Sequence, residues 1–404
     1  MVLILSLLAY ARGCDVEDDW KPSDSKQKEH VSHLYPVTVD GKFGFINQSG
    51  QLVISLPDDV YSVRPFSEGL AAIAKRVPNT SGNWGFIDES GNVAIRPVFN
   101  NAKPFSEGLA AVIVGETKGV IGKVGYIDKT GQLVIQPQFD TGGVESDYAF
   151  SNGLAAVFGQ NGKWGYIDKT GKFVIEPEFS AAFPFSEGRA LVQLSDRKYS
   201  NENLWGYINT IGEAIVPPTF GNAGGFSELL APAEFDEQKV GYISRQGELT
   251  IRPMFDAGSQ CPHTRGTLTE RGFYEGLAAV KLGGKWGFID KSGHLAIKPA
   301  FDCAERFNEG MALVGVRKDM RWQFGYIDKT GTVIIEPQFT AARMFSGDLA
   351  LVGVGMTDDE VALKTLTDAK AGKSESDIEK ELKSSKMKYG YIDRSGKFVW
   401  RPTN

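Results

Sequence analysis

A short phrase that recurs nine times constrains this chain more than any other feature. In its clearest copy, at residues 163–171, it reads Lys-Trp-Gly-Tyr-Ile-Asp-Lys-Thr-Gly. Each copy has a glycine followed by Tyr or Phe and then Ile, and this glycine is Gly44, Gly85, Gly125, Gly165, Gly206, Gly241, Gly287, Gly325 or Gly390. Most copies are 38 to 41 residues apart, with three intervals of 35, 46 and 65. Such a period indicates a repeat architecture in which neighbouring units complete one another's core.

Each repeat is predicted to be an all-β unit. In the copy above, residues 154–158, 164–167 and 173–175 have the length and apolar or aromatic composition of strands. Turn-forming residues separate the three runs, and Pro177 ends the third because it has no N–H to give to a sheet. The sequence therefore predicts an all-β tandem array of about nine three-stranded antiparallel meanders of ~40 residues each.

The strand glycine and the third strand predict how the units pack. A glycine inside a strand implies a close neighbour, and we expect an aromatic of the neighbouring unit, for instance the Phe after its Pro (Phe139 or Phe179), to cover this glycine. Both faces of the third strand are apolar, which predicts sheets stacked face to face. Nine units exceed the ~4 to 8 blades of common propellers, so an open, curved, solenoid-like stack is favoured over the alternative, a closed β-propeller.

The repeated phrases resemble a known family. Residues 163–177 resemble the WG (KWG) repeat of bacterial proteins, as does Phe-Ser-Glu-Gly-Leu-Ala-Ala-Val at 105–112. The resemblance covers about residues 34–404. Trp itself occupies the first position in four copies, Trp84, Trp164, Trp205 and Trp286. The resemblance implies a β-rich repeat in an exported protein, with interaction roles and no common catalytic residues.

Two irregular segments interrupt the array. The 65-residue interval contains a highly charged stretch with two helix-start patterns, which predicts a short helical insertion near 358–386, within residues 356–387 at a hairpin tip. A smaller insertion, residues 259–271, enlarges the sixth unit. Insertions in repeat arrays map to loops and often to the binding face; the alternative is a plain surface loop.

The N-terminus predicts export. Residues 1–14 contain an apolar run that is too short to span a bilayer and suits a signal peptide. Cleavage after Ala11 and a lipoprotein-type site with Cys14 as the lipid-attachment residue both fit, while a short core strand is a third interpretation. Residues 15–33 are polar and predict a flexible tether. We therefore expect a bacterial cell-envelope protein, periplasmic or on the surface, that touches the membrane only through its N-terminal lipid.

Cys261 and Cys303 form a candidate disulfide. They lie 42 residues apart, about one repeat, and each follows the Pro-x-Phe-Asp segment of its unit. Adjacent repeats bring equivalent positions close together, so a disulfide is possible in an oxidising compartment. Two buried thiols are the other possibility.

No pattern for catalysis, metal or cofactor binding stands out, and we expect no enzyme. The net charge is −6 and the cations are dispersed, which argues against nucleic-acid binding. Two of the four histidines, His30 and His33, lie in the tether, and His263 follows Cys261 without the partners that a zinc site needs. The repeated turn Asp and the Glu of Phe-Ser-Glu-Gly are interpreted as turn and loop residues. The favoured function is an exported scaffold that binds protein partners or an envelope polymer; the alternatives are a carbohydrate-active enzyme and a purely structural envelope protein.

Overall fold

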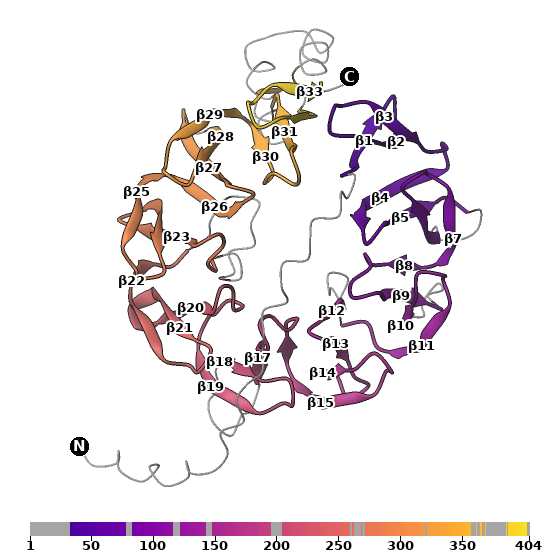
Figure 1. Ribbon diagram of the computed structural model, residues 1–404, viewed down its shortest axis with the longest axis horizontal. Helices are drawn as coiled ribbons and strands as arrows, with labels where there is room; N and C mark the ends of the chain where they lie inside the picture. Colours follow the sequence, from indigo (N-terminus) through magenta and orange to yellow (C-terminus); the bar gives the residue numbers. More distant parts are fainter. Residues whose placement is uncertain are drawn as a thin grey trace. The chain divides into compact units, whose positions relative to one another are not determined.

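The chain folds into small antiparallel sheets arranged in a ring (Figure 1). In the computed structural model, the described residues are 33–77, 83–115, 122–142, 148–194, 204–258, 261, 268, 271–319, 321–356, 361, 364–365, 368, 385 and 387–401. They belong to one compact unit, Ser32–Asn404. The lipid-attachment candidate Cys14, the tether up to residue 32 and His263 lie outside the described residues.

The ring has nine blades, each built from one continuous stretch of chain. Blade 1 contains β1 (Tyr35–Val39), β2 (Lys42–Ile46) and β3 (Leu52–Ser55); blade 2 contains β4 (Val60–Ser67), β5 (Leu70–Lys75), β6 (Asn83–Asp88) and β7 (Val93–Phe99); blade 3 contains β8 (Asn101–Ala102), β9 (Ala110–Val114), β10 (Lys123–Ile127) and β11 (Leu133–Phe139). Blade 4 contains β12 (Phe150–Ser151), β13 (Leu154–Phe158), β14 (Trp164–Ile167) and β15 (Phe173–Phe179); blade 5 contains β16 (Ala181–Ala182), β17 (Ala190–Leu194), β18 (Leu204–Ile208) and β19 (Ala214–Phe220).

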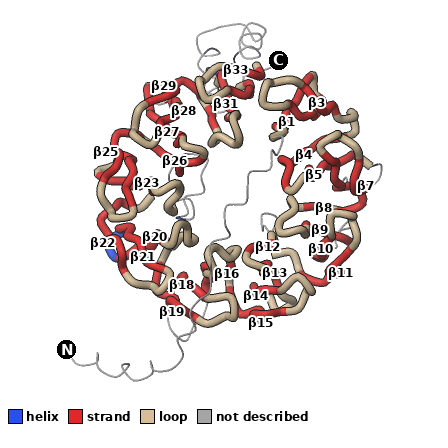
Figure 2. The backbone as a smooth tube through the Cα atoms, in the orientation of Figure 1, coloured by secondary structure: helices blue, strands red, loops and turns tan. Residues whose placement is uncertain are grey.

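The other four blades follow the same order. Blade 6 contains β20 (Leu230–Phe235), the 3-10 turn η1 (Asp236–Gln238), β21 (Lys239–Ser244) and β22 (Leu249–Asp256); blade 7 contains β23 (Leu277–Leu282), β24 (Lys285–Asp290) and β25 (Leu295–Phe301). Blade 8 contains β26 (Cys303–Asn308), β27 (Met311–Lys318), β28 (Arg321–Asp328) and β29 (Val333–Phe339); blade 9 contains β30 (Ala341–Ala342), β31 (Ala350–Val354), β32 (Lys388–Ile392) and β33 (Phe398–Trp400). Figure 2 shows strands alternating with loops around the ring.

The all-β prediction is confirmed, but the predicted three-stranded unit is incomplete. Six of the nine sheets have four strands. The segment expected to be a loose connection supplies the extra strand, which lies on the inner side of the ring in Figure 1. Four of the six inner strands have only two residues, as in Ala181–Ala182, whereas β4 has eight and β26 has six.

The predicted open stack is wrong, because the first and last blades pack together and close a nine-bladed β-propeller. Tyr35 and Val37 of blade 1 share a buried cluster with Leu349 and Tyr391 of blade 9. The Tyr391 hydroxyl donates a hydrogen bond of 3.0 Å to the Pro36 carbonyl, across 355 residues of sequence. The prediction relied on the number of repeats. It did not consider that the apolar faces of the two terminal units complement each other.

The recurrent strand glycine is crowded, but not by an aromatic of the neighbouring unit as predicted. β15 bulges opposite β14: Trp164 pairs with Phe179 and Tyr166 with Ile175, so three residues of β15 pass over Gly165. A Cβ on Gly165 would lie 2.7 Å from the Ile175 carbonyl oxygen. The glycine is therefore required by the backbone of its own blade's outer strand.

The outer strands form the rim of the ring, so the prediction that both their faces are buried is also wrong. In β11, Leu133 and Val134 are 37 and 47 % exposed, whereas Ile135 is buried. The same exposed, exposed, buried order begins β7, β25 and β29. The blades pack side by side, so only one face and the inner edge of each outer strand are covered.

The predicted helical insertion lies mostly outside the described residues and stays a prediction. Of its described members, Val361, Lys364, Thr365 and Asp368 have helical backbone, and Thr365 donates its hydroxyl to the Val361 carbonyl. Among the residues described, no helix is long and apolar enough to cross a membrane.

Candidate interaction faces

Strand order sorts the connections of each blade onto two faces of the ring. In a four-stranded antiparallel meander, the first and third hairpin turns lie at one end of the strands and the second at the other. The Phe-Ser-Glu-Gly turns and the Asp-x-x-Gly turns therefore share one face, which we call the turn face. The tips of the second hairpins and the connections between blades share the opposite face, which we call the loop face. Both irregular segments, near 259–270 and 357–386, start from the loop face.

The repeated aspartates of the turn face are turn formers, as predicted. The Asp168 carboxylate accepts hydrogen bonds from the backbone N–H of Thr170 at 2.8 Å and of Lys172 at 3.2 Å. The hydrogen bond from the Thr170 hydroxyl is the main cause that lowers the pKa of Asp168. Asn209 and Ser244 accept the same pair of backbone hydrogen bonds in their blades. These carboxylates are engaged in holding their own turns.

The Glu of each Phe-Ser-Glu-Gly turn joins two blades. The Glu107 carboxylate in blade 3 accepts the N–H of Gly153 in blade 4 at 3.1 Å and pairs with Lys169 of the same blade at 3.2 Å. We call this arrangement the glutamate clamp. Glu107 holds a left-handed backbone, with φ of 51°, which is uncommon for glutamate. Equivalent ion pairs join Glu68 to Lys129, Glu228 to Lys291 and Glu275 to Lys329.

The clamp residues vary together along the chain. The second residue of the Asp-x-x-Gly turn is a cation wherever the preceding blade supplies the Glu, as at Lys129, Lys169, Arg245, Lys291, Lys329 and Arg394. It is Thr210 after Asn152 of blade 4 and Gln48 after Gly347 of blade 9. It is Glu89 after blade 1, which has no such turn among the described residues. The glutamate and the cation of the clamp are thus present together or absent together, although Asn152 still accepts the Gly188 N–H at 2.9 Å. Contacts between blades therefore recur along the turn face.

Buried tyrosines add a second repeated link. The Tyr166 hydroxyl donates 2.7 Å to the Phe183 carbonyl of the next blade, and burial strongly raises the pKa of Tyr166. Tyr126, Tyr207, Tyr242 and Tyr326 donate in the same way. Sequence reasoning identified these tyrosines as strand residues and missed their hydroxyl role, although Phe replaces Tyr in three copies of the phrase.

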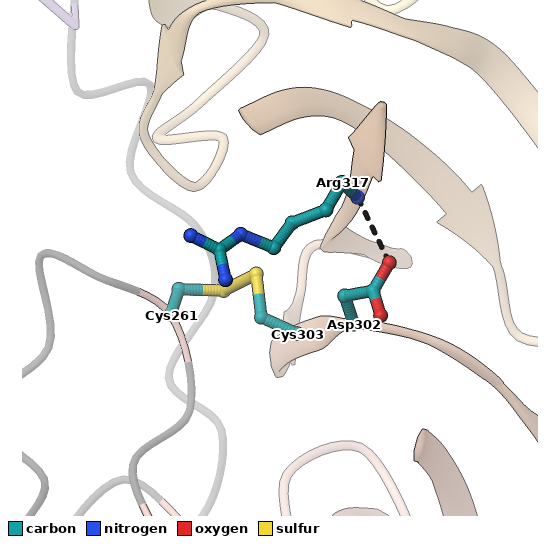
Figure 3. The surroundings of a disulfide bond; sticks show 4 residues. All are labelled: Cys261, Asp302, Cys303 and Arg317. Atoms are coloured by element: carbon teal, nitrogen blue, oxygen red, sulfur yellow. Dashed lines mark hydrogen bonds between the residues drawn. A yellow bond between two sulfur atoms is a disulfide. The ribbon is translucent and has the colours of Figure 1, made fainter. Parts of the chain in front are cut away.

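The segment near 259–270, predicted to enlarge the sixth unit, connects blades 6 and 7 and is called the blade 7 insertion below. Its two described residues, Cys261 and Leu268, are each fixed to a neighbouring blade. Cys261 forms a disulfide with Cys303 of blade 8, with 5.0 Å between the Cα atoms (Figure 3). Leu268 is buried in the core between blades 6 and 7, where its backbone takes the space next to Gly224. A Cβ on Gly224 would lie 2.4 Å from the Leu268 carbonyl oxygen, which explains the glycine at that position.

Arg271 follows the insertion in sequence and holds its end against blades 6 and 7. Its guanidinium donates to the Asp256 carbonyl at 3.1 Å and also to the Gly258 carbonyl, and it stacks 4.5 Å from the Trp286 ring centroid. Burial lowers the pKa of Arg271 to about 10. Trp286 is fully buried, whereas Trp84, Trp164 and Trp205 are half-buried. The Arg271 guanidinium is therefore engaged in covering the Trp286 ring.

The remaining predicted groups do not assemble a reactive site in the described part of the chain. The His33 ring packs 6.5 Å from Tyr35, and His294 bonds to the Ser292 hydroxyl in its turn. No group of three or more His, Cys, Asp or Glu with metal-binding geometry occurs among the described residues.

Comparisons with known proteins agree with this architecture. The sequence matches the family described as WG containing repeat at residues 43–76, 84–117, 125–164, 164–199, 205–237, 271–286, 286–318 and 324–355. A comparison with curated proteins gave no match. A structure titled "Crystal structure of the eukaryotic initiation factor" is 12% identical, with a TM-score of 0.57, and covers 93% of this chain and 100% of its own. BamB from Moraxella catarrhalis is 13% identical, with a TM-score of 0.43, over 75% of this chain and 90% of its own. At these identities the likeness concerns the fold alone.

Proposed function

The chain belongs to the WG containing repeat family, and from this premise we propose that it is an exported, lipid-anchored propeller that binds protein partners through its loop face. The observation that carries the proposal is the contrast between the two faces. The turn face repeats the same self-contained contacts from blade to blade, whereas the loop face carries both irregular segments. Insertions in repeat proteins map to loops on one face, which is often the binding face.

Exposed side chains favour a protein partner over a carbohydrate. Of the 16 large hydrophobic residues exposed in the described part of the chain, one, Tyr389, is aromatic, and 12 lie on the outer strands of the rim rather than on the loop face. Sugar-binding surfaces depend on exposed aromatic rings, and protein interfaces on apolar area of any kind. We accordingly propose binding rather than catalysis as the activity, with an envelope polymer as the second choice of ligand.

Export and anchoring rest on the N-terminal sequence and the disulfide. Cys14 follows an apolar run that suits a signal peptide, and Cys261–Cys303 suits an oxidising compartment. Cys14→Ser is expected to move the protein from the membrane fraction to the soluble fraction of the native host. In the same cells Cys261 and Cys303 should resist alkylation until a reductant is added. An uncleaved protein whose Cys261 and Cys303 are alkylated without a reductant would contradict export.

Site-specific photocrosslinking tests the binding face. A benzophenone amino acid at Leu282, a loop-face residue 37 % exposed, is expected to yield a protein adduct in intact cells. The matched control is Ile211, a turn-face residue 67 % exposed, which should yield no adduct. Adducts from Ile211 alone, or adducts to carbohydrate alone, would contradict a protein partner on the loop face.

A further inference from the structure

The paired strands of the second hairpin of blade 8 are longer than those described in the other blades. β27 and β28 each have eight residues, whereas the paired strands of the other second hairpins have four to six. Lys318 pairs with Arg321 at its tip, four residues before Gly325; in blade 7 the last pair, Leu282 with Lys285, lies two residues before Gly287. Two more residue pairs add ~7 Å of projection at the rise of an antiparallel strand.

This tip combines cations with a flat aromatic stack. Arg317, Lys318 and Arg321 are exposed, with Asp319 as the one acid among residues 316–323. The Trp322 ring lies parallel to Phe324, 5.8 Å between centroids and 13° between planes. The Arg317 guanidinium lies 5.2 Å from the Trp322 centroid. The hairpin tip carries a formal charge of +2 in a chain of −6.

The base of the hairpin is rigidly held. Cys303 pairs with Gly315 in the sheet, so the disulfide joins the hairpin's own blade to the blade 7 insertion. Figure 3 shows the Arg317 side chain extending from its strand toward this disulfide. The Arg317 backbone N–H donates 2.8 Å to Asp302, which also pairs with Lys285 at 2.7 Å. The Arg317 backbone thus binds the nearby acid, while its exposed side chain lies beside Trp322.

We propose that the described residues of the blade 8 hairpin, 316–319 and 321–323, bind an acidic segment of a protein partner. Carboxylates match the guanidinium groups of Arg317 and Arg321 in charge and in their paired hydrogen-bond geometry, while Trp322 offers an apolar surface beside them. A charge of +2 is too small for a nucleic-acid backbone, which needs a broad basic stripe. This inference rests on the proposed protein-binding function and specifies its partner.

A charge-reversal pair tests the proposal in the full-length protein. The probe is a fluorescein-labelled peptide with three copies of Glu-Ala-Glu-Phe, followed by fluorescence anisotropy. Arg317→Glu with Arg321→Glu is expected to weaken binding on the order of tenfold or more. Arg252→Glu with Lys298→Glu, the same charge change at two exposed positions on outer strands, should leave binding within about twofold. Arg317→Gln with Arg321→Gln should give an intermediate loss.

Several results would overturn the acidic-segment proposal. They are no binding of the peptide to the native protein, equal losses in the two charge-reversal variants, or equal binding of a peptide with Lys in place of Glu. Tighter binding of single-stranded oligothymidylate would reassign the hairpin to nucleic acid. Unchanged melting temperatures of the variants confirm that folding is not the cause. Crosslinking from Leu282 reports on the general function independently, so the two failures are distinguishable.

Discussion

The seam between blades 9 and 1 differs from the interface between blades 3 and 4 in how the turn face is held. At the interface of blades 3 and 4, Glu107 binds Gly153 and Lys169 in a glutamate clamp. At the seam, Gly347 replaces the glutamate, and the Tyr35 hydroxyl accepts the Asp348 N–H at 3.2 Å. The Tyr35 and Tyr391 rings pack 5.4 Å apart. A charged clamp is thus replaced by buried aromatic packing.

Only the tyrosine link is common to both interfaces. Tyr391 donates to Pro36 at 3.0 Å, as Tyr126 donates to Tyr148 at 3.0 Å. Blade 1 has no inner strand among the described residues. The Tyr391 hydroxyl therefore bonds directly to β1, which takes the place of the second strand in the four-stranded blades. Pro36 suits that edge because it has no N–H to leave unpaired. The comparison teaches that ring closure depends on complementary apolar shape, while the internal interfaces add charge.

The largest effect is expected from Tyr35→Ala. Removing a buried aromatic side chain should cost about 3 to 5 kcal/mol in unfolding free energy, measured by urea denaturation. Hydrogen exchange should rise first in β1 and β32, because no chain connects them across the seam. Tyr148→Ala at the interface of blades 3 and 4 is the control and should leave β1 protected. If β1 were equally protected from exchange in the two variants, the proposed difference between the seam and the internal interface would be wrong.

Transplanting the clamp into the seam should be harmful. In Gly347→Glu with Gln48→Lys, a Cβ at position 347 would lie 2.4 Å from the Tyr35 hydroxyl and 2.9 Å from His33. Overpacking of this kind costs about 1 to 3 kcal/mol, which a lower melting temperature would report. A higher melting temperature would mean that the seam lacks only the ion pair, contrary to the aromatic-packing account.

Removing one tyrosine hydroxyl should have a similar effect at both kinds of interface. Tyr391→Phe and Tyr166→Phe each leave a carbonyl without its donor, at a cost of about 1 to 3 kcal/mol. Urea midpoints of the two variants test this equality. A loss confined to Tyr166→Phe would show that the Pro36 carbonyl finds water at the seam.

The smallest expected effect separates the two interfaces by pH. Burial alone would raise the pKa of Glu275, but the hydrogen bond from Lys329 and backbone N–H groups outweigh it and lower the pKa below its ordinary 4.5. The clamp's stability is therefore present above pH 4.5 and lost as pH falls through the lowered pKa. Glu275→Gln should flatten the stability curve below pH 5 in urea titrations.

The seam should respond in the opposite direction. Burial raises the pKa of Tyr35 above its ordinary 10.0, so its contribution is complete below pH 10 and is lost as pH rises through the raised value. Tyr35→Phe should remove only the share of the alkaline loss that Tyr35 contributes, because buried tyrosines of the internal interfaces, such as Tyr166, also have raised pKa values. The stability below pH 5 should stay unchanged. A change in stability below pH 5 caused by Tyr35→Phe would contradict the assignment of the clamp to the internal interfaces.

The sequence predicted the local structure well because short-range chemistry decides it. The turn role of Asp168 and the β strands around Gly165 follow from turn chemistry and side-chain alternation. Ring closure was not predictable in this way, since it depends on packing between Tyr35 and Tyr391, far apart in the chain. The bulge over Gly165 was also missed, because Pro177 signals a strand end and the strand continues past it.

The loop-face interpretation was open to sequence reasoning only in part. The two insertions were recognised from the spacing of the repeats, and the pairing of Cys261 with Cys303 was one of two readings. The blade 8 hairpin escaped notice because its interval of 38 residues is ordinary. Its extra strand length becomes visible only when Arg317 is found opposite Trp322.

Among the described residues no strand is shared between the chain ends, so each blade can form from its own stretch of chain and ring closure comes last. Blade 1 presents Tyr35 and Val37 to water until β32 is made, about 350 residues later. At ~5 to 20 residues per second of synthesis, that apolar surface waits ~20 to 70 s for its partner. If the chain is exported, holding chaperones would bind it during this interval. The seam residues are the surface that they would shield.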